Sequence, residues 1–405
     1  MTLLSTNKRP KVAVAMSGGV DSAVAALLLA EAGYDVLGVT LKLFCYGDAD
    51  GEATDRTCCS LDAIEDARRS ARAIGARHVV LDFTDEFRAG VLEPFAEDYV
   101  GGRTPSPCVA CNSEVKFNRF LSRALRLGAD FIATGHYARV AEAAEGDGGG
   151  RALLAGIDPA KDQSYFLWGI GRDALARVLL PIGALTKPEV RAHARRAGLP
   201  VAEKRESMDI CFVPRGDYGT FLERERARRA AVGIGSGVAV TARGAASAPI
   251  GAIDDARWEA ALSPGPILDR AGTRVGTHAG TARYTVGQRK GLGLSAARPL
   301  YVTAVDPERR AVVVGEDTEL LAAGCEGEGT NFLAPVESGT TLRAAARIRH
   351  RHAPVPSNVA VLADGRVRVR FDAPQRAVTP GQSVVLYDGE RLLGGAVISR
   401  ALPRE

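Results

Sequence analysis

The chain has 405 residues, of which 46% are hydrophobic and 25% are charged, a composition typical of soluble globular proteins. Its length exceeds one ordinary hydrophobic core and predicts two or three domains. The sequence contains no apolar run long enough to span a bilayer and no signal peptide at its N-terminus. We therefore expect a cytoplasmic protein without a membrane partner.

Charge is unevenly distributed along the chain, whose net charge is +4. Residues 1–215 contain 27 Lys and Arg against 28 Asp and Glu, whereas residues 216–405 contain 25 against 20. The basic excess of the second half fits a polyanionic partner without requiring one.

The first half alternates strand and helix patterns. We expect a buried strand at 11–15 and further strands at 36–41, 78–83 and 131–134. We expect helices at 22–32, 61–74, 86–99, 114–127 and 187–197, with a loop at 100–112. This alternation predicts a parallel sheet covered by helices on both faces.

The second half has a different pattern, in which long helical periodicity ends near Arg229. Short β-runs separated by turn signals predict a barrel or a sandwich. The expected strands are 283–286, 300–305, 311–314, 344–348, 366–371, 383–387 and 396–399. Two stretches, 141–150 and 226–263, are rich in small residues and are expected to be flexible insertions.

The strongest motif is Ser17-Gly18-Gly19-Val20-Asp21-Ser22, between the first predicted strand and the first predicted helix. Glycines allow close backbone approach to a ligand, and the helix that follows offers unpaired N–H groups to an anion. Ser17 and Ser22 add hydroxyl donors, and Asp21 is a candidate ligand for magnesium. The motif lacks the Gly-Lys-Ser/Thr ending of a Walker loop. The alternative is an ordinary strand-to-helix turn.

Seven cysteines form the second signal, because an odd number in a chain of this length argues against a disulfide scaffold. Cys108 and Cys111 form a Cys-x-x-Cys pair, which can bind metal, form a reversible disulfide or be incidental. Cys211, taken alone, is compatible with a buried small hydrophobic residue. We expect the other four to be spectators: Cys45, Cys58, Cys59 and Cys325.

Several longer strings accompany these two motifs, spread over several hundred residues. They are 104–112 (TPSPCVACN), 134–137 (TGHY), 161–165 (KDQSY), 209–212 (DICF), 264–267 (PGPI) and 284–291 (YTVGQRKG). With SGGVDS they resemble the bacterial tRNA-specific 2-thiouridylases of the PP-loop ATP pyrophosphatase superfamily. The resemblance implies an α/β PP-loop ATP-binding catalytic domain with a parallel sheet over residues 1–215. It further implies a small, mostly β, tRNA-binding central domain with an insertion over 216–296, and a C-terminal β-barrel over 297–405.

The resemblance also implies roles for individual residues. Cys111 takes the position of the nucleophile and Cys211 that of the persulfide carrier, and Cys108 joins them as a catalytic candidate. The implied ATP-binding residues are Ala15, Met16, Ser17, Gly18, Gly19, Val20, Asp21, Ser22, Leu41 and Gly135. The implied tRNA-binding residues are Ser106, Pro107, Cys108, His136, Lys161, Asp162, Gln163, Arg349, His350 and Gln382.

The implied reaction is ATP-dependent 2-thiolation of the tRNA wobble uridine. AMP is attached to uridine O2, the persulfide delivers sulfur to C2, and AMP and pyrophosphate are the by-products. A Cys111–Cys211 disulfide remains and must be reduced before the next turnover. The resemblance implies Lys, Glu and Gln tRNAs as substrates, ATP and Mg²⁺ as cofactors, and a persulfide carrier or a cysteine desulfurase relay as sulfur source.

This sequence departs from the family pattern at three positions. Cys108 replaces an aspartate of many relatives, Ser106 a common asparagine and His350 a common tyrosine. The first change leaves three cysteines, Cys108, Cys111 and Cys211, which could hold a [4Fe–4S] cluster with one open position.

Two alternating arginine runs, 347–351 and 366–370, are predicted to place arginines on one strand face for contact with phosphates.

Two other functions compete with thiolation. The first is a PP-loop synthetase that adenylates a small carbonyl compound and then adds nitrogen. The second is a nonenzymatic RNA-binding protein on an old ATP fold. The paired cysteine sites and the basic second half speak against the first, and an intact SGGVDS with Cys111 and Cys211 speaks against the second.

Overall fold

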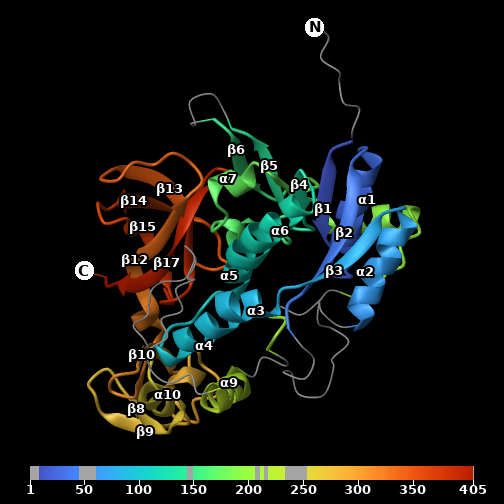
Figure 1. Ribbon diagram of the computed structural model, residues 1–405. Coiled ribbons are helices and arrows are strands. Elements are labelled where there is room, and N and C mark those ends of the chain that lie inside the picture. Colours follow the sequence, from blue (N-terminus) through green and yellow to red (C-terminus); the bar gives the residue numbers. More distant parts are fainter. Residues whose placement is uncertain are drawn as a thin grey trace. The chain divides into compact units, whose positions relative to one another are not determined.

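The computed structural model describes residues 9–44, 61–143, 149–205, 210–213, 218–232 and 253–404 (Figure 1). The chain divides into two compact units. The first comprises Met1–Arg88, Asn112–Pro214 and Glu390–Leu392. The second comprises Ala89–Cys111, Arg215–Gly389 and Leu393–Glu405. No helix of the described residues is long and apolar enough to cross a membrane.

The first unit is built on a parallel sheet with the strand order β3-β2-β1-β4-β7. Its strands are β1 (Lys11–Ala15), β2 (Asp35–Lys42), β3 (Arg77–Asp82), β4 (Phe131–Ala133) and β7 (Val178–Leu179). The predicted α/β fold with a parallel sheet is confirmed. The central strand β1 carries Val12 and Val14, both fully buried because helices cover the face of the sheet from which they project.

Three helices pack around this sheet: α1 (Val20–Glu31), α2 (Leu61–Ala73) and α8 (Lys187–Arg196). Helix α1 is an Ala- and Leu-rich segment whose residues are mostly buried. Helix α8 begins with a capping box between Thr186 and Glu189. Helices α2 and α8 bring residues that are distant in the sequence next to the loop that precedes α1.

Two predicted helices contain π-helical segments. The first consists of α3 (Thr84–Phe87), a π-helical stretch (Arg88–Leu92) and α4 (Glu93–Val100). The second consists of α5 (Pro107–Ala110), a π-helical stretch (Cys111–Phe120) and α6 (Leu121–Arg126). The prediction of a loop through residue 112 is therefore wrong. Helix α5 begins at Pro107, because the fixed φ of proline and its missing N–H suit a first helical turn.

A hairpin of β5 (Ala138–Glu142) and β6 (Arg151–Ala155) replaces part of the predicted insertion at 141–150. Residues 144–148 of that stretch lie outside the described part of the chain. Arg391 and Leu392 pair with β6, and Glu390 accepts a hydrogen bond from Arg139 Nη2 at 2.7 Å. The hairpin thereby ties a C-terminal segment into the first unit.

The second unit contains a four-stranded sheet with the order β10-β11-β8-β9. Its strands are β8 (Gly265–Leu268), β9 (Arg274–His278), β10 (Tyr301–Asp306) and β11 (Ala311–Gly315). The predicted strand at 283–286 is wrong. Thr285 N donates to Gln288 Oε1 at 3.1 Å and Gly287 has a φ of 89°, so this segment turns instead of extending.

Two helices accompany this sheet, α9 (Tyr218–Val232) and α10 (Asp255–Leu262). Asp254 caps α10 by accepting a hydrogen bond from Arg257 N at 2.8 Å. Both helices lie at the ends of the predicted 226–263 insertion, whose residues 233–252 are outside the described part of the chain.

Six strands form the C-terminal barrel of the second unit, in the order β12-β15-β14-β13-β16-β17, and β12 also pairs with β17. They are β12 (Leu321–Phe332), β13 (Thr341–Arg347), β14 (Val355–Val361), β15 (Val367–Arg376), β16 (Ser383–Asp388) and β17 (Arg391–Leu402). The predicted β-barrel is confirmed. Val367, Val369 and Phe371 are buried, whereas Arg368 and Arg370 between them are exposed.

The other arginine run does not follow this alternation. Strand β13 ends at Arg347, and a turn follows in which Arg347 Nε donates to His352 O at 2.9 Å. The prediction that the three arginines at 347–351 share one strand face is wrong, because the chain reverses within the run.

Candidate active site

The SGGVDS loop connects β1 to α1 in a conformation that requires glycine. Gly18 has a φ of 72°, and a Cβ atom there would lie 2.2 Å from Ala63 O of α2. Gly135, after β4, also packs too closely for a side chain, since a Cβ atom there would lie 2.6 Å from Ser22 N. The structure therefore places the predicted ATP-binding residue Gly135 against the predicted phosphate loop.

The loop is also held from within and from the neighbouring helix. Ser22 Oγ accepts from Ser17 N at 3.3 Å and donates to Gly19 O at 3.1 Å. Lys204 Nζ donates to Gly18 O at 3.0 Å and pairs with Asp66 of α2 at 2.5 Å. No side chain caps the N-terminus of α1, which follows Gly19. Its first N–H groups therefore remain available to an anion.

Asp21 is the most highly connected side chain of this loop. Its Oδ1 accepts from Tyr137 Oη at 2.7 Å, and Lys187 Nζ lies 2.8 Å from both of its carboxylate oxygens. Lys187 is buried, with its ammonium 5.8 Å from the centroid of the Tyr137 ring. Sequence reasoning assigned no role to Tyr137 or Lys187. Tyr137 belongs to the motif string 134–137, whereas Lys187 is only the first residue of the predicted helix 187–197.

Met16 and Leu41, two further predicted ATP-binding residues, are buried at the ends of β1 and β2. Thr40 Oγ1 donates to Met16 O at 2.9 Å. A Cβ atom on Gly38 would lie 2.8 Å from Met16 Sδ, so the small residue in β2 makes room for the methionine.

Two predicted tRNA-binding residues of the first unit, Asp162 and Gln163, hold the structure around Tyr137. Gln163 Oε1 accepts from Tyr137 N at 3.0 Å, and Gln163 N donates to Tyr137 O at 2.8 Å. Asp162 is buried and its Oδ1 accepts from Gly156 N and Ser164 N, both at 3.0 Å. The neighbouring Lys161 is half-buried. These contacts give Asp162 and Gln163 a positioning role inside the protein.

His136 precedes Tyr137 and is neutral at physiological pH. Its Nδ1 lies 2.7 Å from Thr134 Oγ1, and its ring centroid lies 5.9 Å from that of Phe117. Burial, with a smaller effect from the charge of Lys116, holds the pKa of His136 well below its usual value. The lowered pKa favours the neutral form of this ring.

The cysteine-bearing segment of the second unit is held by the barrel. Gln382 Nε2 donates to Thr104 O at 2.9 Å and to Pro105 O at 3.1 Å. Thr104 N donates to Pro380 O at 2.9 Å. Gly381 has a φ of 90°, and its Cβ would lie 2.8 Å from Thr104 N. Gln382, predicted to contact tRNA, thus uses both of its N–H donors on the loop before Cys108.

The same loop is fixed at its start. Arg103 Nη1 donates to Glu328 Oε1 of β12 at 3.0 Å, and Arg103 N donates to Asp98 O at 2.8 Å. Gly102 has a φ of 74°, and its Cβ would lie 2.5 Å from Pro307 Cγ. Residues 101–106 are therefore held by backbone and side-chain contacts at both ends.

The three candidate cysteines sit on short helical or turn segments. Cys108 lies in α5 and is half-buried, and Cys111 opens the π-helical stretch and is 8% exposed. Both belong to the second unit. Cys211 lies in a turn of the first unit and is half-buried beside Phe212, whose ring packs edge-on against Phe87 at 5.8 Å.

The remaining cysteines and metal donors are placed as follows. Cys325 is fully buried in the barrel core, and burial raises the pKa of its thiol. Cys45, Cys58 and Cys59 lie outside the described residues. Within the described ranges, no group of three His, Cys, Asp or Glu side chains is arranged to hold a metal ion.

Arg349 and His350, both predicted to contact tRNA, are half-buried in the turn after β13. Arg349 Nη2 donates to Arg376 O at 3.2 Å.

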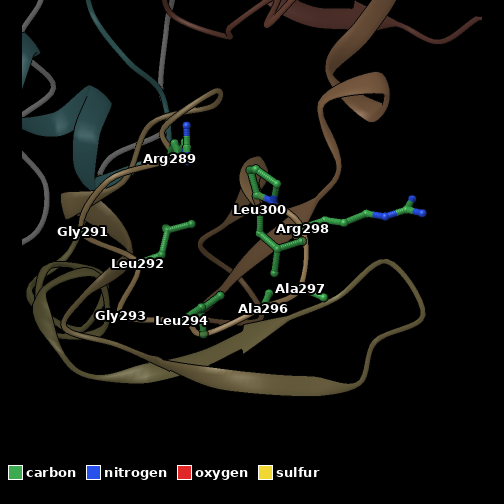
Figure 2. Close-up of a pocket in the computed structure, with 10 residues that line it drawn as sticks. Arg289, Gly291, Leu292, Gly293, Leu294, Ala296, Ala297, Arg298 and Leu300 are labelled. Carbon is green, nitrogen blue, oxygen red and sulfur yellow. The ribbon is translucent and has the colours of Figure 1, made fainter.

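A pocket of about 420 Å³ in the second unit contains none of the residues named above for catalysis, ATP or tRNA, although Arg289 and Gly291 of its lining belong to the 284–291 motif string. It is lined by Arg289, Gly291, Leu292, Gly293, Leu294, Ala296, Ala297, Arg298, Pro299 and Leu300 (Figure 2). Arg298 extends away from it and pairs with Glu316 at 3.0 Å.

Family comparisons agree with this arrangement. Residues 10–215 match a tRNA methyl transferase HUP domain, residues 258–316 a tRNA methyl transferase PRC-barrel domain, and residues 323–398 an aminomethyltransferase β-barrel domain. The tRNA-specific 2-thiouridylase MnmA of Geobacter metallireducens is 48% identical over 402 residues, covering 98% of this chain and 99% of that relative. The chain belongs to the tRNA-specific 2-thiouridylase family.

Further members of the 2-thiouridylase family show the same extent of similarity. MnmA of Geotalea uraniireducens is 44% identical, covering 99% of this chain and 98% of that relative. MnmA of Roseiflexus castenholzii is 42% identical, covering 96% and 99%. The family resemblance predicted from the motif strings is thereby confirmed along nearly the whole chain.

Proposed function

We propose that this protein is a tRNA-uridine 2-sulfurtransferase that uses ATP to exchange O2 of the wobble uridine for sulfur. Its membership of the 2-thiouridylase family over nearly its whole length is the observation that carries the proposal. The glycine-dependent SGGVDS loop and the retained Cys111 and Cys211 support it chemically, because thiolation needs both an activating nucleotide and a sulfur-transferring thiol pair.

The activation half of the reaction belongs to the first unit. The SGGVDS loop and the N-terminus of α1 bind the triphosphate, and the adenine and ribose lie near Leu41 and Gly135. The positive charge of Lys187, fixed beside Asp21, stabilises negative charge on the phosphates as uridine O2 attacks the α-phosphorus. Pyrophosphate leaves, and the O2–AMP bond turns a poor leaving group into a good one.

Magnesium fits this site. Asp21 Oδ1 already accepts two hydrogen bonds, whereas Oδ2 accepts one from Lys187 and keeps acceptor capacity for a hard cation. When bound, Mg²⁺ would neutralise charge on the triphosphate.

The sulfur half of the reaction uses the two cysteines. The terminal sulfur of a Cys211 persulfide attacks C2, and AMP departs with the C2–O2 bond electrons. The Cys111 thiolate then attacks the Cys211 sulfur, which breaks the S–S bond to the transferred atom and leaves 2-thiouridine. The product Cys111–Cys211 disulfide takes two electrons from a dithiol reductant before the next cycle.

The [4Fe–4S] hypothesis is a separate matter, and no step above is routed through a cluster. The described residues contain no three-donor arrangement that fits a metal ion. Anaerobic purification tests the hypothesis directly, because iron and visible absorbance that depend on Cys108 would support it.

The RNA substrate is proposed to be the Lys, Glu and Gln tRNAs. Its contacts are proposed to include Ser106, Pro107, Cys108, His136, Lys161, Arg349 and His350. Asp162, Gln163 and Gln382 are proposed to act mainly through the backbone that they hold. Sulfur is proposed to arrive from a persulfide carrier or a cysteine desulfurase relay. The domain boundaries at residues 215 and 296 are part of the same proposal.

The test is thiolation of unmodified tRNA with ATP, Mg²⁺ and a persulfide source, followed by mass spectrometry of 2-thiouridine. The parent chain and Cys325→Ala, a matched control at a buried barrel cysteine, should form product. Cys111→Ser and Cys211→Ser should form none but should still release pyrophosphate when tRNA is present. ATP cleavage that ignores tRNA and yields no thiouridine would instead support a small-molecule synthetase.

A further inference from the structure

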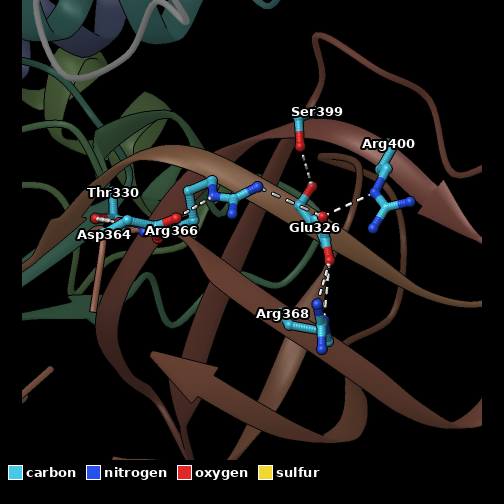
Figure 3. Close-up of polar contacts among 8 residues, drawn as sticks. Glu326, Thr330, Asp364, Arg366, Arg368, Ser399 and Arg400 are labelled. Atoms are coloured by element: carbon cyan, nitrogen blue, oxygen red, sulfur yellow. Dashed lines mark hydrogen bonds and ion pairs between the residues drawn. The ribbon is translucent and has the colours of Figure 1, made fainter. Parts of the chain in front are cut away.

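Three neighbouring strands of the barrel align charged residues in register. Glu326 of β12 lies opposite Arg368 of β15 on one side and Arg400 of β17 on the other. Arg368 Nε and Nη2 donate to Glu326 Oε1 at 3.0 and 2.8 Å, and Arg400 Nε donates to Oε2 at 2.8 Å (Figure 3). The ladder thus places one carboxylate between two guanidinium groups.

A third arginine lies beside this row. Arg366 Nη1 is 3.9 Å from Glu326 Oε2, and its Nε donates to Asp364 Oδ2 at 2.7 Å. The side chain of Glu326 is only 4% exposed, whereas those of Arg366, Arg368 and Arg400 are 48%, 46% and 62% exposed. We call these three arginines the arginine cluster. Its carboxylate partner lies beneath and its guanidinium groups face solvent.

The cluster carries more positive charge than its partners neutralise. Three guanidinium groups face two carboxylates, and the exposed Arg370 follows two residues along the same strand face. Elsewhere on the barrel, Arg343 and Asp372 form a one-to-one bidentate pair at 2.8 and 2.7 Å. One arginine is enough to neutralise the charge of Glu326. The strand register places two arginines, Arg368 and Arg400, opposite it, so the cluster has more positive charge than this carboxylate needs.

The geometry suits a polyanion with regularly spaced charges. Each guanidinium has five N–H donors, and Arg400 uses its Nε for Glu326, which leaves both of its Nη groups without a hydrogen bond among the described residues. Arg368 and Arg370 alternate along β15, about 7 Å apart, and Arg366 lies immediately before this strand. Because Glu326 restrains Arg368 and Arg400, less side-chain entropy is lost when a second anion binds them.

We propose that the arginine cluster is a docking surface for the phosphate backbone of the tRNA substrate. This inference rests on the proposed function, and it adds a contact surface to the predicted site residues. The cluster contacts phosphates and not bases, so it contributes affinity without reading sequence.

The experiment measures tRNA binding by fluorescence anisotropy across a range of salt concentrations, using the full chain and unmodified tRNA. Arg368→Gln with Arg400→Gln should raise Kd at least tenfold and lower the slope of log K against log salt by about 1.5, as expected for two lost phosphate contacts. Arg343→Gln, the matched control, should change neither. Lysine at both positions should restore the slope because it retains the two charges.

Thermal melting establishes that each variant is folded. If the double variant does not fold, Arg400→Gln alone serves, because it leaves Glu326 bonded to Arg368, and its slope should fall by about 0.8. A parent chain that binds and thiolates tRNA, with variants of unchanged Kd and slope, would overturn the inference and leave the proposed function intact. The cluster would then only lock strands together. A parent chain that binds no tRNA would overturn both.

Discussion

Gln382 provides the sharpest test of how the barrel supports the cysteine segment. Its two amide N–H groups donate to Thr104 O and Pro105 O at 2.9 and 3.1 Å, four residues or fewer before Cys108. Gln382→Ala removes both bonds, and each contributes about 1 kcal/mol net. A loss of about 2 kcal/mol from the held conformation of the loop corresponds to roughly a 30-fold lower rate if only that conformation reacts.

The assay is single-turnover thiolation at saturating tRNA and ATP, with tRNA Kd measured separately. We expect Gln382→Ala to lower the rate and to leave Kd within about twofold. Gln382→Glu keeps an acceptor oxygen but loses both donors, so it should be as slow as the alanine variant. Gln375→Ala is the matched control, because the Gln375 amide donates to Ala373 O, two residues away, at 2.6 Å, and its other partner among the described residues is His352, so it makes no contact with the cysteine loop.

The opposite pattern would refute this reasoning. In that outcome, Gln382→Ala would weaken the Kd for tRNA but leave the rate at saturation unchanged, and Gln382→Glu would keep the Kd of the parent chain. This result would show that Gln382 contacts tRNA through its acceptor oxygen and does not position the loop.

Three further predictions follow. Gly18→Ala should lower the free energy of unfolding by at least about 2 kcal/mol more than Gly33→Ala in urea titrations, because both positions have positive φ but only Gly18 has a backbone oxygen in the way. Lys187→Met, which removes the cation beside Asp21, should slow tRNA-dependent pyrophosphate release about 10- to 100-fold. The control Lys42→Met breaks the exposed ion pair with Asp82 and should not change the rate. Equal rates for the two variants would show that Lys187 takes no part in the activation step. Desolvation holds the pKa of the half-buried His136 well below its usual value in the folded state, whereas the unfolded chain binds a proton there near pH 6.5, so stability should fall as the pH drops below that value. His136→Gln should lose less stability between pH 7 and pH 5 in thermal melts, and an identical loss would contradict the lowered pKa.

The sequence by itself determined the elements that depend on local chemistry. Alternating patterns predicted the parallel sheet, because strand and helix periods are read within about ten residues. Gly18 and Gly19 between a strand and a helix indicated the phosphate loop, and the motif strings indicated the family. The alternation in β15 predicted which arginines are exposed, because a strand has a period of two.

Only the tertiary structure decided which distant residues meet. Tyr137 and Lys187 reach Asp21 from 116 and 166 residues away. Arg368 and Arg400 meet Glu326 across 42 and 74 residues. Gln382 reaches the cysteine loop from 277 residues away. Such contacts depend on strand order and register, which are set by the packing of the whole chain and leave no local pattern in the sequence.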